Sequence, residues 1–197
     1  MSKIGHSRWQ YDYPPLKLTY YFGTKSGGTS ICQALGVHCS VVNNKWVDLK
    51  EPFKKNSGWF SATSCRNPLD RLVSAFHSAQ NPDCGPSSYF LHHELGLKGN
   101  KCTFTNFIHA ITEHKPHNLN WHIIPQTHLS PEDVDYVIRY EHLQEDWANL
   151  GSKFNIGELP HKNQSQHEPY MTYYTKETYD IVVEYYNCDF VRFGYEL

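Results

Sequence analysis

Three short stretches rich in aromatic and apolar residues predict β-strands. They cover residues 16–22, 58–65 and 136–140, and the first shows a partial alternation of apolar and polar side chains. Residues 23–30, with the sequence GTKSGGTS, follow the first stretch directly, and their glycines predict a turn that ends the strand. The chain is therefore expected to open with a strand, a glycine-rich turn and a helix.

Apolar residues spaced three and four positions apart predict helices between and after these strands. The expected helices cover residues 30–35, 68–79, 104–114 and 143–154, with a last one starting near Thr175. Asn67 suits the N-cap of the second helix, because Pro68 would occupy its first position. Residues 130–133 predict one helical turn, whereas 37–57 show no clear pattern and 80–102 predict a loop. The alternation of strands and helices predicts an α/β fold, a three-layer domain with a mainly parallel central sheet.

The composition is typical of a folded protein, with 197 residues of which 39% are apolar and 15% aromatic. This length predicts a single domain over residues 1–197. No run of about 18 apolar residues occurs, and the N-terminus lacks the apolar segment of a secretory signal. We therefore expect a soluble, cytoplasmic protein with reduced thiols, although Cys84 and Cys102 could pair if the chain were exported.

The formal net charge of −2 argues against a nucleic-acid-binding protein. The charge is uneven, because residues 1–60 carry eight basic and three acidic side chains while residues 131–197 carry five and thirteen. An anion is therefore expected to bind in the N-terminal part of the chain. The thirteen histidines include no H-E-x-x-H pattern, so no metal site is expected.

The segment KSGGTS at residues 25–30 concentrates groups that bind anions. Glycines let backbone N–H groups approach an anion, and the start of the following helix adds partial positive charge. Lys25 supplies a full charge, and Thr29 and Ser30 supply hydroxyl donors. The simpler alternative is an ordinary turn with an exposed lysine. The segment is not a Walker A loop, because that motif places its lysine directly after the last glycine.

A second candidate begins at Arg66, where the second predicted strand ends. Open α/β sheets bind ligands at this carboxyl edge, and arginine suits phosphate through its fork of donors. Ser74 lies two helical turns further along and off the apolar stripe of its helix, so its hydroxyl could face a second anion. The simpler alternative is helix capping, with Asp70 and Arg71 as local electrostatics.

Together, TKSGGTS at 24–30 and CRNPLDRLVSAF at 65–76 resemble the two cofactor motifs of sulfotransferases. The likeness is to carbohydrate O-sulfotransferases of the heparan sulfate 2-O and chondroitin 4-O type, and it covers residues 16–195. It continues in the same order through NWHIIPQ at 120–126, YVIRYEHL at 136–143, LPHKNQSQH at 159–167, YYTKE at 173–177 and FGY at 193–195. The resemblance implies a P-loop-like turn that binds a phosphosulfate.

The resemblance further implies the donor 3′-phosphoadenosine 5′-phosphosulfate (PAPS), with 3′,5′-adenosine bisphosphate as product and no metal. Arg66 and Ser74 would then hold the 3′-phosphate. The 5′-phosphosulfate would be held by the glycine-rich turn, namely Lys25, Ser26, Gly27, Gly28, Thr29 and Ser30. A polar stretch that resembles a lid over the nucleotide, or is simply a polar loop, would add Lys162, Asn163, Ser165 and His167.

The implied reaction is in-line transfer of a sulfuryl group to a hydroxyl of an acceptor, expected to be a carbohydrate. Lys25 and the N–H groups of the turn would stabilise the charge on the leaving oxygen. A general base is also expected, and its candidates between the two motifs are His38, Asp48 and Glu51. His122 and His161 are further alternatives from later segments.

Two other classes of function stay open on the sequence alone. A P-loop-like nucleotide phosphotransferase would be stabilised by ATP–Mg²⁺, whereas a sulfotransferase would be stabilised by 3′,5′-adenosine bisphosphate. A domain that binds a nucleotide or glycan without turnover would show no transfer of sulfate. No motif names the acceptor, and the limited basic charge suits a neutral or weakly acidic sugar at least as well as a polyanion.

Overall fold

The computed structural model describes residues 7–36, 45–48, 52–80, 90–160 and 168–197. The chain divides into two compact units, each built from two segments. The first unit comprises Met1–Arg66 and Gln126–Asn163, and the second comprises Asn67–Pro125 and Gln164–Leu197. The single domain expected over residues 1–197 stays a prediction.

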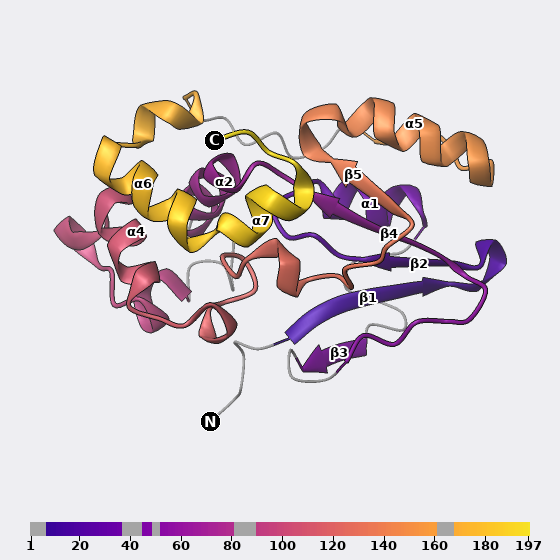
Figure 1. Cartoon of the computed structure of the whole chain (residues 1–197), viewed down its shortest axis with the longest axis horizontal. Helices are drawn as coiled ribbons and strands as arrows, with labels where there is room; N and C mark the ends of the chain where they lie inside the picture. The colour runs from indigo at the N-terminus through magenta and orange to yellow at the C-terminus, as the bar shows by residue number, and fades with distance from the viewer. Residues whose placement is uncertain (1–6, 37–44, 49–51, 81–89, 161–167) are drawn as a thin grey trace. The chain divides into compact units, whose positions relative to one another are not determined.

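The first unit contains a five-stranded sheet in the order β3-β1-β2-β4-β5 (Figure 1). The strands are β1 (Ser7–Tyr13), β2 (Leu18–Tyr21), β3 (Lys45–Asp48), β4 (Phe60–Cys65) and β5 (Tyr136–Arg139). β2 pairs in parallel with β4, and β4 pairs in parallel with β5. β1 pairs antiparallel with both β2 and β3. The sheet is therefore mixed, and the expectation of a mainly parallel sheet is wrong.

The two antiparallel strands come from segments in which no strand was expected. β1 belongs to the polar N-terminal segment, and β3 lies in the stretch 37–57 that shows no clear pattern. A 3₁₀ turn, Pro14–Leu16, followed by Lys17 at φ 48°, reverses the chain between β1 and β2. Such a short connection permits only antiparallel pairing. Because β1 has a strand on each side, backbone hydrogen bonds hold it without a strongly apolar sequence.

One face of the sheet packs against the helices α1 (Gly28–Ala34) and α5 (Leu143–Phe154). Tyr20 of β2 and Ala62 of β4 are cross-strand neighbours on this face, and both are buried. Trp147 of α5 is also buried, and its Nε1–H donates to the Gly157 carbonyl at 2.8 Å. The buried core is formed by Tyr11, Leu18, Tyr20, Ile31, Cys32, Leu35, Ala62, Ile138, Trp147, Leu150 and Leu159. The sheet and these helices make two layers, and the three-layer arrangement stays a prediction.

The second unit is helical. Its helices are α2 (Pro68–Gln80), α4 (Phe104–Thr112), α6 (Lys176–Tyr185) and α7 (Asn187–Phe193), with a π-helical turn at Phe90–Glu94. The predicted start of α2 is confirmed, because the Asn67 side-chain oxygen accepts the Leu69 N–H at 2.9 Å and Pro68 occupies the first position. Short 3₁₀ turns of this unit lie at Gly99–Lys101, Pro116–Asn118 and Tyr170–Tyr173, whereas those at Gln126–His128 and Tyr140–His142 belong to the first unit.

Arg71 of α2, considered from the sequence only for local electrostatics, has a structural role. Its side chain is fully buried, and its guanidinium donates to the carbonyls of Ile124 at 2.8 Å and Trp121 at 3.4 Å. A buried charge needs such partners, because an unpaired one is costly in a low dielectric. Arg71 therefore attaches the segment 121–124 to α2.

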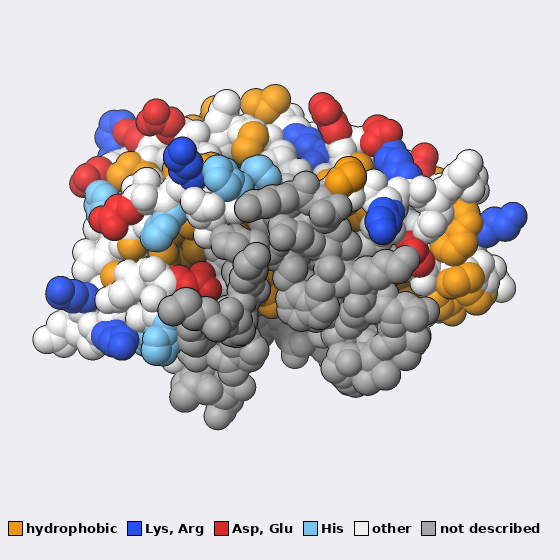
Figure 2. Space-filling view, turned by 90° about the horizontal axis from the view of Figure 1, so that it is seen from below, with side chains coloured by type: hydrophobic (Ala, Val, Ile, Leu, Met, Phe, Trp, Pro, Cys, Tyr) orange, Lys and Arg blue, Asp and Glu red, His pale blue; other side chains and the backbone are white. Residues whose placement is uncertain are grey.

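Several predicted helix boundaries move. α1 begins two residues earlier than expected, and the last predicted helix is divided into α6 and α7 at Tyr186. Residues 130–133 contain a turn at 132–133 and no helix. Among the described helices, none combines the length and apolarity that crossing a membrane requires. On the face drawn in Figure 2, the described Lys and Arg side chains are interspersed with Asp and Glu and form no continuous basic patch.

Candidate active site

The glycine-rich turn joins the end of β2 to the start of α1. Lys25 and Gly27 both have left-handed backbone conformations, with φ of 62° and 79°, while Ser26 between them does not. Alternation of this kind lets successive backbone N–H groups form a concave site for an anion. The Lys25 side chain is half-buried, and Thr29 in the first turn of α1 is exposed.

Buried hydrogen bonds attach this turn to β4. The Ser26 hydroxyl donates to the Ser64 carbonyl at 3.2 Å and lies 3.0 Å from the Ser64 hydroxyl, which lies 2.6 Å from the Tyr20 hydroxyl. Burial raises the pKa of Tyr20 well above its usual value, so the phenol stays protonated. Gly23 allows the close approach, because a Cβ there would lie 2.0 Å from the Ser64 carbonyl oxygen.

Arg66 follows β4 directly and is only 4% exposed. Because β2 and β4 are parallel neighbours, the segments after them meet at one edge of the sheet. There the Arg66 Nη1 donates to the Lys25 carbonyl at 3.2 Å. The guanidinium carbon lies 4.0 Å from the centre of the Tyr140 ring, which is the geometry of a cation–π contact. The two candidate motifs therefore touch within the first unit.

Gln126 holds the backbone of Arg66. Its side-chain oxygen accepts the Arg66 N–H at 2.9 Å, and its side-chain nitrogen donates to the Arg66 carbonyl at 2.8 Å. Gln126 is 2% exposed, so this reciprocal pair is shielded from water. A buried amide that satisfies both backbone groups restrains Arg66 at the point where β4 ends.

The comparisons with known proteins decide the family. The model of the sulfotransferase family matches residues 18–196, almost the whole chain. The chain belongs to the sulfotransferase family. Comparisons with curated proteins and with solved structures gave no match. Family membership makes the protein a transferase of sulfuryl groups, and the donor and acceptor expected from the sequence stay proposals.

The described part of this sulfotransferase contains only some of the expected site residues. Lys25, Ser26, Gly27, Gly28, Thr29, Ser30 and Arg66 all belong to the first unit. The Ser26 hydroxyl is hydrogen-bonded to Ser64, so a ligand would meet the backbone N–H group of Ser26 instead.

The remaining expected residues lie elsewhere. Ser74 belongs to the second unit and is 3% exposed in α2. The backbone of Asp48 ends β3, and its side chain lies outside the described part. The other expected residues outside the described part are His38, Glu51, His161, Lys162, Asn163, Ser165 and His167.

His122, an alternative base, lies in a buried polar chain of the second unit. Its Nδ1 is 2.9 Å from the Asn120 side-chain oxygen, and the Asn120 amide donates to Glu94 at 3.2 Å. The imidazole also stacks on Phe90, with ring centroids 5.7 Å apart. These contacts fix the orientation of the ring, which suits a structural role as well as a catalytic one.

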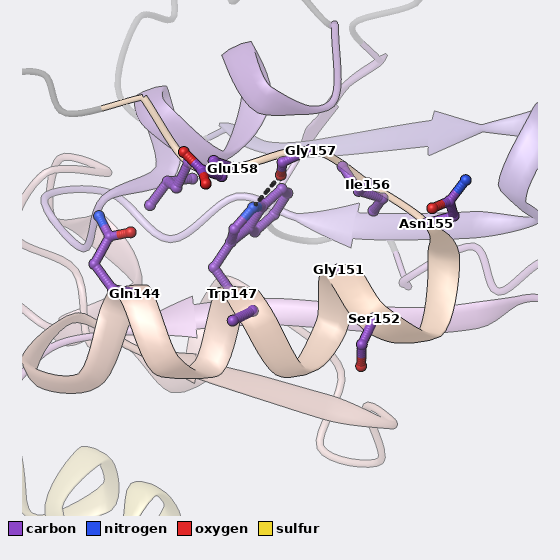
Figure 3. A pocket seen from close by; sticks show the side chains of 10 residues that line it. Gln144, Trp147, Gly151, Ser152, Asn155, Ile156, Gly157 and Glu158 are labelled. Atoms are coloured by element: carbon purple, nitrogen blue, oxygen red, sulfur yellow. Dashed lines mark hydrogen bonds between the residues drawn. The ribbon is translucent and has the colours of Figure 1, made fainter.

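A pocket of about 500 Å³ lies along α5 in the first unit (Figure 3). It is lined by Gln144, Trp147, Ala148, Gly151, Ser152, Asn155, Ile156, Gly157, Glu158 and Leu159. None of the expected site residues is among them.

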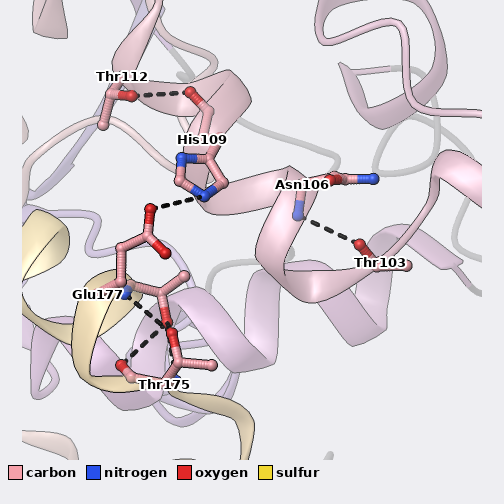
Figure 4. A network of polar contacts seen from close by, with 7 residues as sticks. Thr103, Asn106, His109, Thr112, Thr175 and Glu177 are labelled. Atoms are coloured by element: carbon pink, nitrogen blue, oxygen red, sulfur yellow. Dashed lines mark hydrogen bonds and ion pairs between the residues drawn. The ribbon is translucent and has the colours of Figure 1, made fainter.

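In the second unit, His109 of α4 faces Glu177 of α6 at 3.7 Å (Figure 4). Thr103 and Thr175 are the N-caps of these two helices. This exposed ion pair joins two helices. In the described ranges, no group of three or more His, Cys, Asp or Glu is arranged to hold a metal ion.

No role in the site was expected for Gln126 or Tyr140. Both stand in segments that carried the resemblance, NWHIIPQ and YVIRYEHL. A polar glutamine after a proline and a tyrosine at a strand end have many uses in proteins, so neither residue type indicates a site. Their contacts with Arg66 emerge only when β4, β5 and the segment at 126 lie side by side.

Proposed function

We propose that this sulfotransferase transfers the sulfuryl group of PAPS to a hydroxyl of an acceptor. The observation that carries the proposal is the hydrogen bond from Arg66 to the Lys25 carbonyl at 3.2 Å. It joins the glycine-rich turn and the buried arginine at the carboxyl edge of two parallel strands, the edge where α/β proteins bind nucleotides.

The chemistry of the donor groups fits a phosphosulfate. A guanidinium offers five N–H donors in a plane, and stacking on Tyr140 uses the face of that plane and none of its donors. Lys25 adds a positive charge on the adjacent turn, where its side chain is half-buried. α1 has only seven residues, so the support rests on the turn and the two cations more than on a helix dipole.

In the proposed reaction the bound PAPS supplies an activated sulfuryl group. Lys25 would stabilise the negative charge that develops on the leaving oxygen, a contribution often worth several kcal/mol to an enzyme. The residues Ser26, Gly27, Gly28, Thr29 and Ser30 would orient the phosphosulfate through backbone and hydroxyl donors. His38 is proposed as the general base that removes the acceptor proton, with Asp48 as the second candidate.

The remaining assignments follow from the resemblance. Arg66 and Ser74 are proposed to hold the 3′-phosphate, and a lid over the nucleotide is proposed to include Lys162, Asn163, Ser165 and His167. The acceptor is proposed to be a carbohydrate. The five basic and thirteen acidic side chains of residues 131–197 support a neutral or weakly acidic sugar over a polyanion, because a polyanion requires a basic surface.

Substitution of Lys25 tests this function. Lys25→Ala is expected to lower the transfer of radiolabelled sulfate from PAPS to a proven acceptor at least 100-fold, because charge on the leaving oxygen loses its cation. The thermal midpoint should stay within a few degrees of that of the parent, since the side chain is only half-buried.

Lys115→Ala, at an exposed lysine of the second unit, is the matched control and should keep full activity. Unchanged turnover in the Lys25 variant would contradict the proposed role of this residue. A parent protein that binds 3′,5′-adenosine bisphosphate and transfers sulfate to none of a broad panel of hydroxyl acceptors would favour a binding domain instead.

A further inference from the structure

Tyr140 lies beside both anion-binding elements of the first unit. It is the first residue of the 3₁₀ turn Tyr140–His142, directly after β5. Its ring supports the Arg66 guanidinium at 4.0 Å. A Cβ placed on Gly27 of the glycine-rich turn would lie 3.6 Å from the Tyr140 ring and 3.0 Å from Leu143. The same short segment therefore packs against the turn and against the arginine.

We propose that Tyr140 is a positioning residue of the donor site, which keeps Arg66 in place against the turn. This inference rests on the proposed function, because it assumes that the turn and Arg66 bind the donor. Several contacts hold Arg66: the Lys25 carbonyl accepts from its Nη1, Tyr140 stacks on the face of its guanidinium, and Gln126 binds its backbone. The Tyr140 ring also lies close to Gly27 of the turn, where an added Cβ would come within van der Waals contact of it.

The physical effect is preorganisation. A long arginine side chain loses rotamer freedom when it binds an anion, and a residue that already holds it removes part of that entropic cost. A half-buried aromatic ring suits this purpose, because it attracts the cation through its face and leaves the N–H edge to hydrogen-bond acceptors. Loss of the ring should therefore weaken donor binding even though the positive charge is still present.

The first test measures the affinity for 3′,5′-adenosine bisphosphate by calorimetry. Tyr140→Phe keeps the ring and should bind within about twofold of the parent. Tyr140→Leu removes the aromatic face and should bind roughly three- to thirtyfold more weakly, as expected for a cation–π contact. In an Arg66→Met background, Tyr140→Leu should cause no further loss. In Tyr140→Leu, the KM for PAPS should rise while kcat stays nearly constant.

Tyr136→Leu is the matched control, because this half-buried tyrosine of β5 donates to the Asp146 carbonyl and is not among the proposed donor-site residues. It should lower the thermal midpoint without changing the affinity. Two results of the affinity measurements would overturn the inference: an equal loss in Tyr140→Phe and Tyr140→Leu, or a loss from Tyr140→Leu that persists in the Arg66→Met background.

A second readout needs no ligand. Exchange of the Arg66 Nε proton with water, followed by NMR, should be at least about fivefold faster in Tyr140→Leu and unchanged in Tyr140→Phe, since a held guanidinium exchanges slowly. Equal exchange rates in the parent and in Tyr140→Leu would overturn the inference. A parent that fails to bind 3′,5′-adenosine bisphosphate would contradict the proposed function, and the exchange rates would then decide by themselves whether Tyr140 holds Arg66.

Discussion

At the scale of single residues, the turn that follows β2 requires a glycine at position 23, because there is no room there for a Cβ atom. Gly23 approaches β4 so closely that a Cβ would lie 2.0 Å from the Ser64 carbonyl oxygen and 2.3 Å from the Ser26 hydroxyl. Backbone in a parallel ladder cannot move aside easily, so a larger residue must displace the turn. The same closeness allows Ser26 to bond Ser64. The turn can therefore lie this close to the sheet edge only because residue 23 has no side chain.

Gly23→Ala is expected to lower the free energy of unfolding by about 1–3 kcal/mol or more, because the added methyl overlaps backbone. Urea unfolding measures this change. Gly157→Ala is the matched control, since a Cβ there meets nothing within 4 Å, and its change should stay within about 0.5 kcal/mol. Equal effects in the two variants would show that the close contact with Ser64 does not limit residue 23.

At the scale of elements, Asp135 adds hydrogen bonds to Ser61 at one end of the pairing between β4 and β5. Its carboxylate accepts the Ser61 N–H and the Ser61 hydroxyl, both at 2.7 Å, and its own N–H donates to the Ser61 hydroxyl at 3.1 Å. These hydrogen bonds from Ser61 lower the pKa of Asp135 below its ordinary value. A lowered pKa in the folded state means that the ionised carboxylate stabilises the fold.

Asp135→Asn is therefore expected to reduce the free energy of unfolding at pH 7 by only about 0.5–1 kcal/mol, because the carboxylate is exposed and water screens its charge. The stabilisation is fully present above the pKa of the unfolded chain, about 3.9, and is lost as the pH falls through the lower folded value. The difference between parent and variant should consequently shrink below about pH 4. Urea unfolding at a series of pH values measures it.

Asp133→Asn provides the control for this pH series. Asp133 makes an exposed ion pair with Lys55, and such pairs contribute at most about 1 kcal/mol. A variant at Asp135 that behaved like the one at Asp133 at every pH would show that the bonds to Ser61 add nothing measurable.

At the scale of the whole molecule, the chain passes between two compact units three times, after residues 66, 125 and 163. The first unit combines the sheet, the glycine-rich turn and Arg66, whereas the second contains α2 with Ser74 and the polar chain around His122. A ligand that binds only the folded chain stabilises it by an amount that grows with the logarithm of the ligand concentration divided by the dissociation constant.

3′,5′-Adenosine bisphosphate at one hundred times its dissociation constant should stabilise the protein by about 2.7 kcal/mol, in the presence of a metal chelator. ATP–Mg²⁺ at the same concentration should shift the thermal midpoint less, because the proposed donor site is expected to hold a 3′-phosphate that ATP lacks. Differential scanning fluorimetry measures both shifts. A larger shift with ATP–Mg²⁺ would favour a phosphotransferase.

The sequence by itself determined those features of this protein that depend on local interactions. The N-cap Asn67, the first-turn Pro68 and the apolar period of 143–154 all act within a few residues, so α2 and α5 could be located in advance. The contiguous segment 25–30 could likewise be recognised as a candidate anion site. The sulfotransferase family to which the chain was expected to belong is confirmed. Strands β2, β4 and β5 followed from aromatic and β-branched composition.

Only the tertiary structure decided which distant residues support that segment. β1 and β3 form because neighbouring strands satisfy their backbone groups, a cause that no local pattern carries. The contacts of Arg71 with Ile124, and of Gln126 and Tyr140 with Arg66, join residues more than 50 positions apart. Buried polar groups must find partners wherever the fold brings them together, so these roles depend on the packing of the chain.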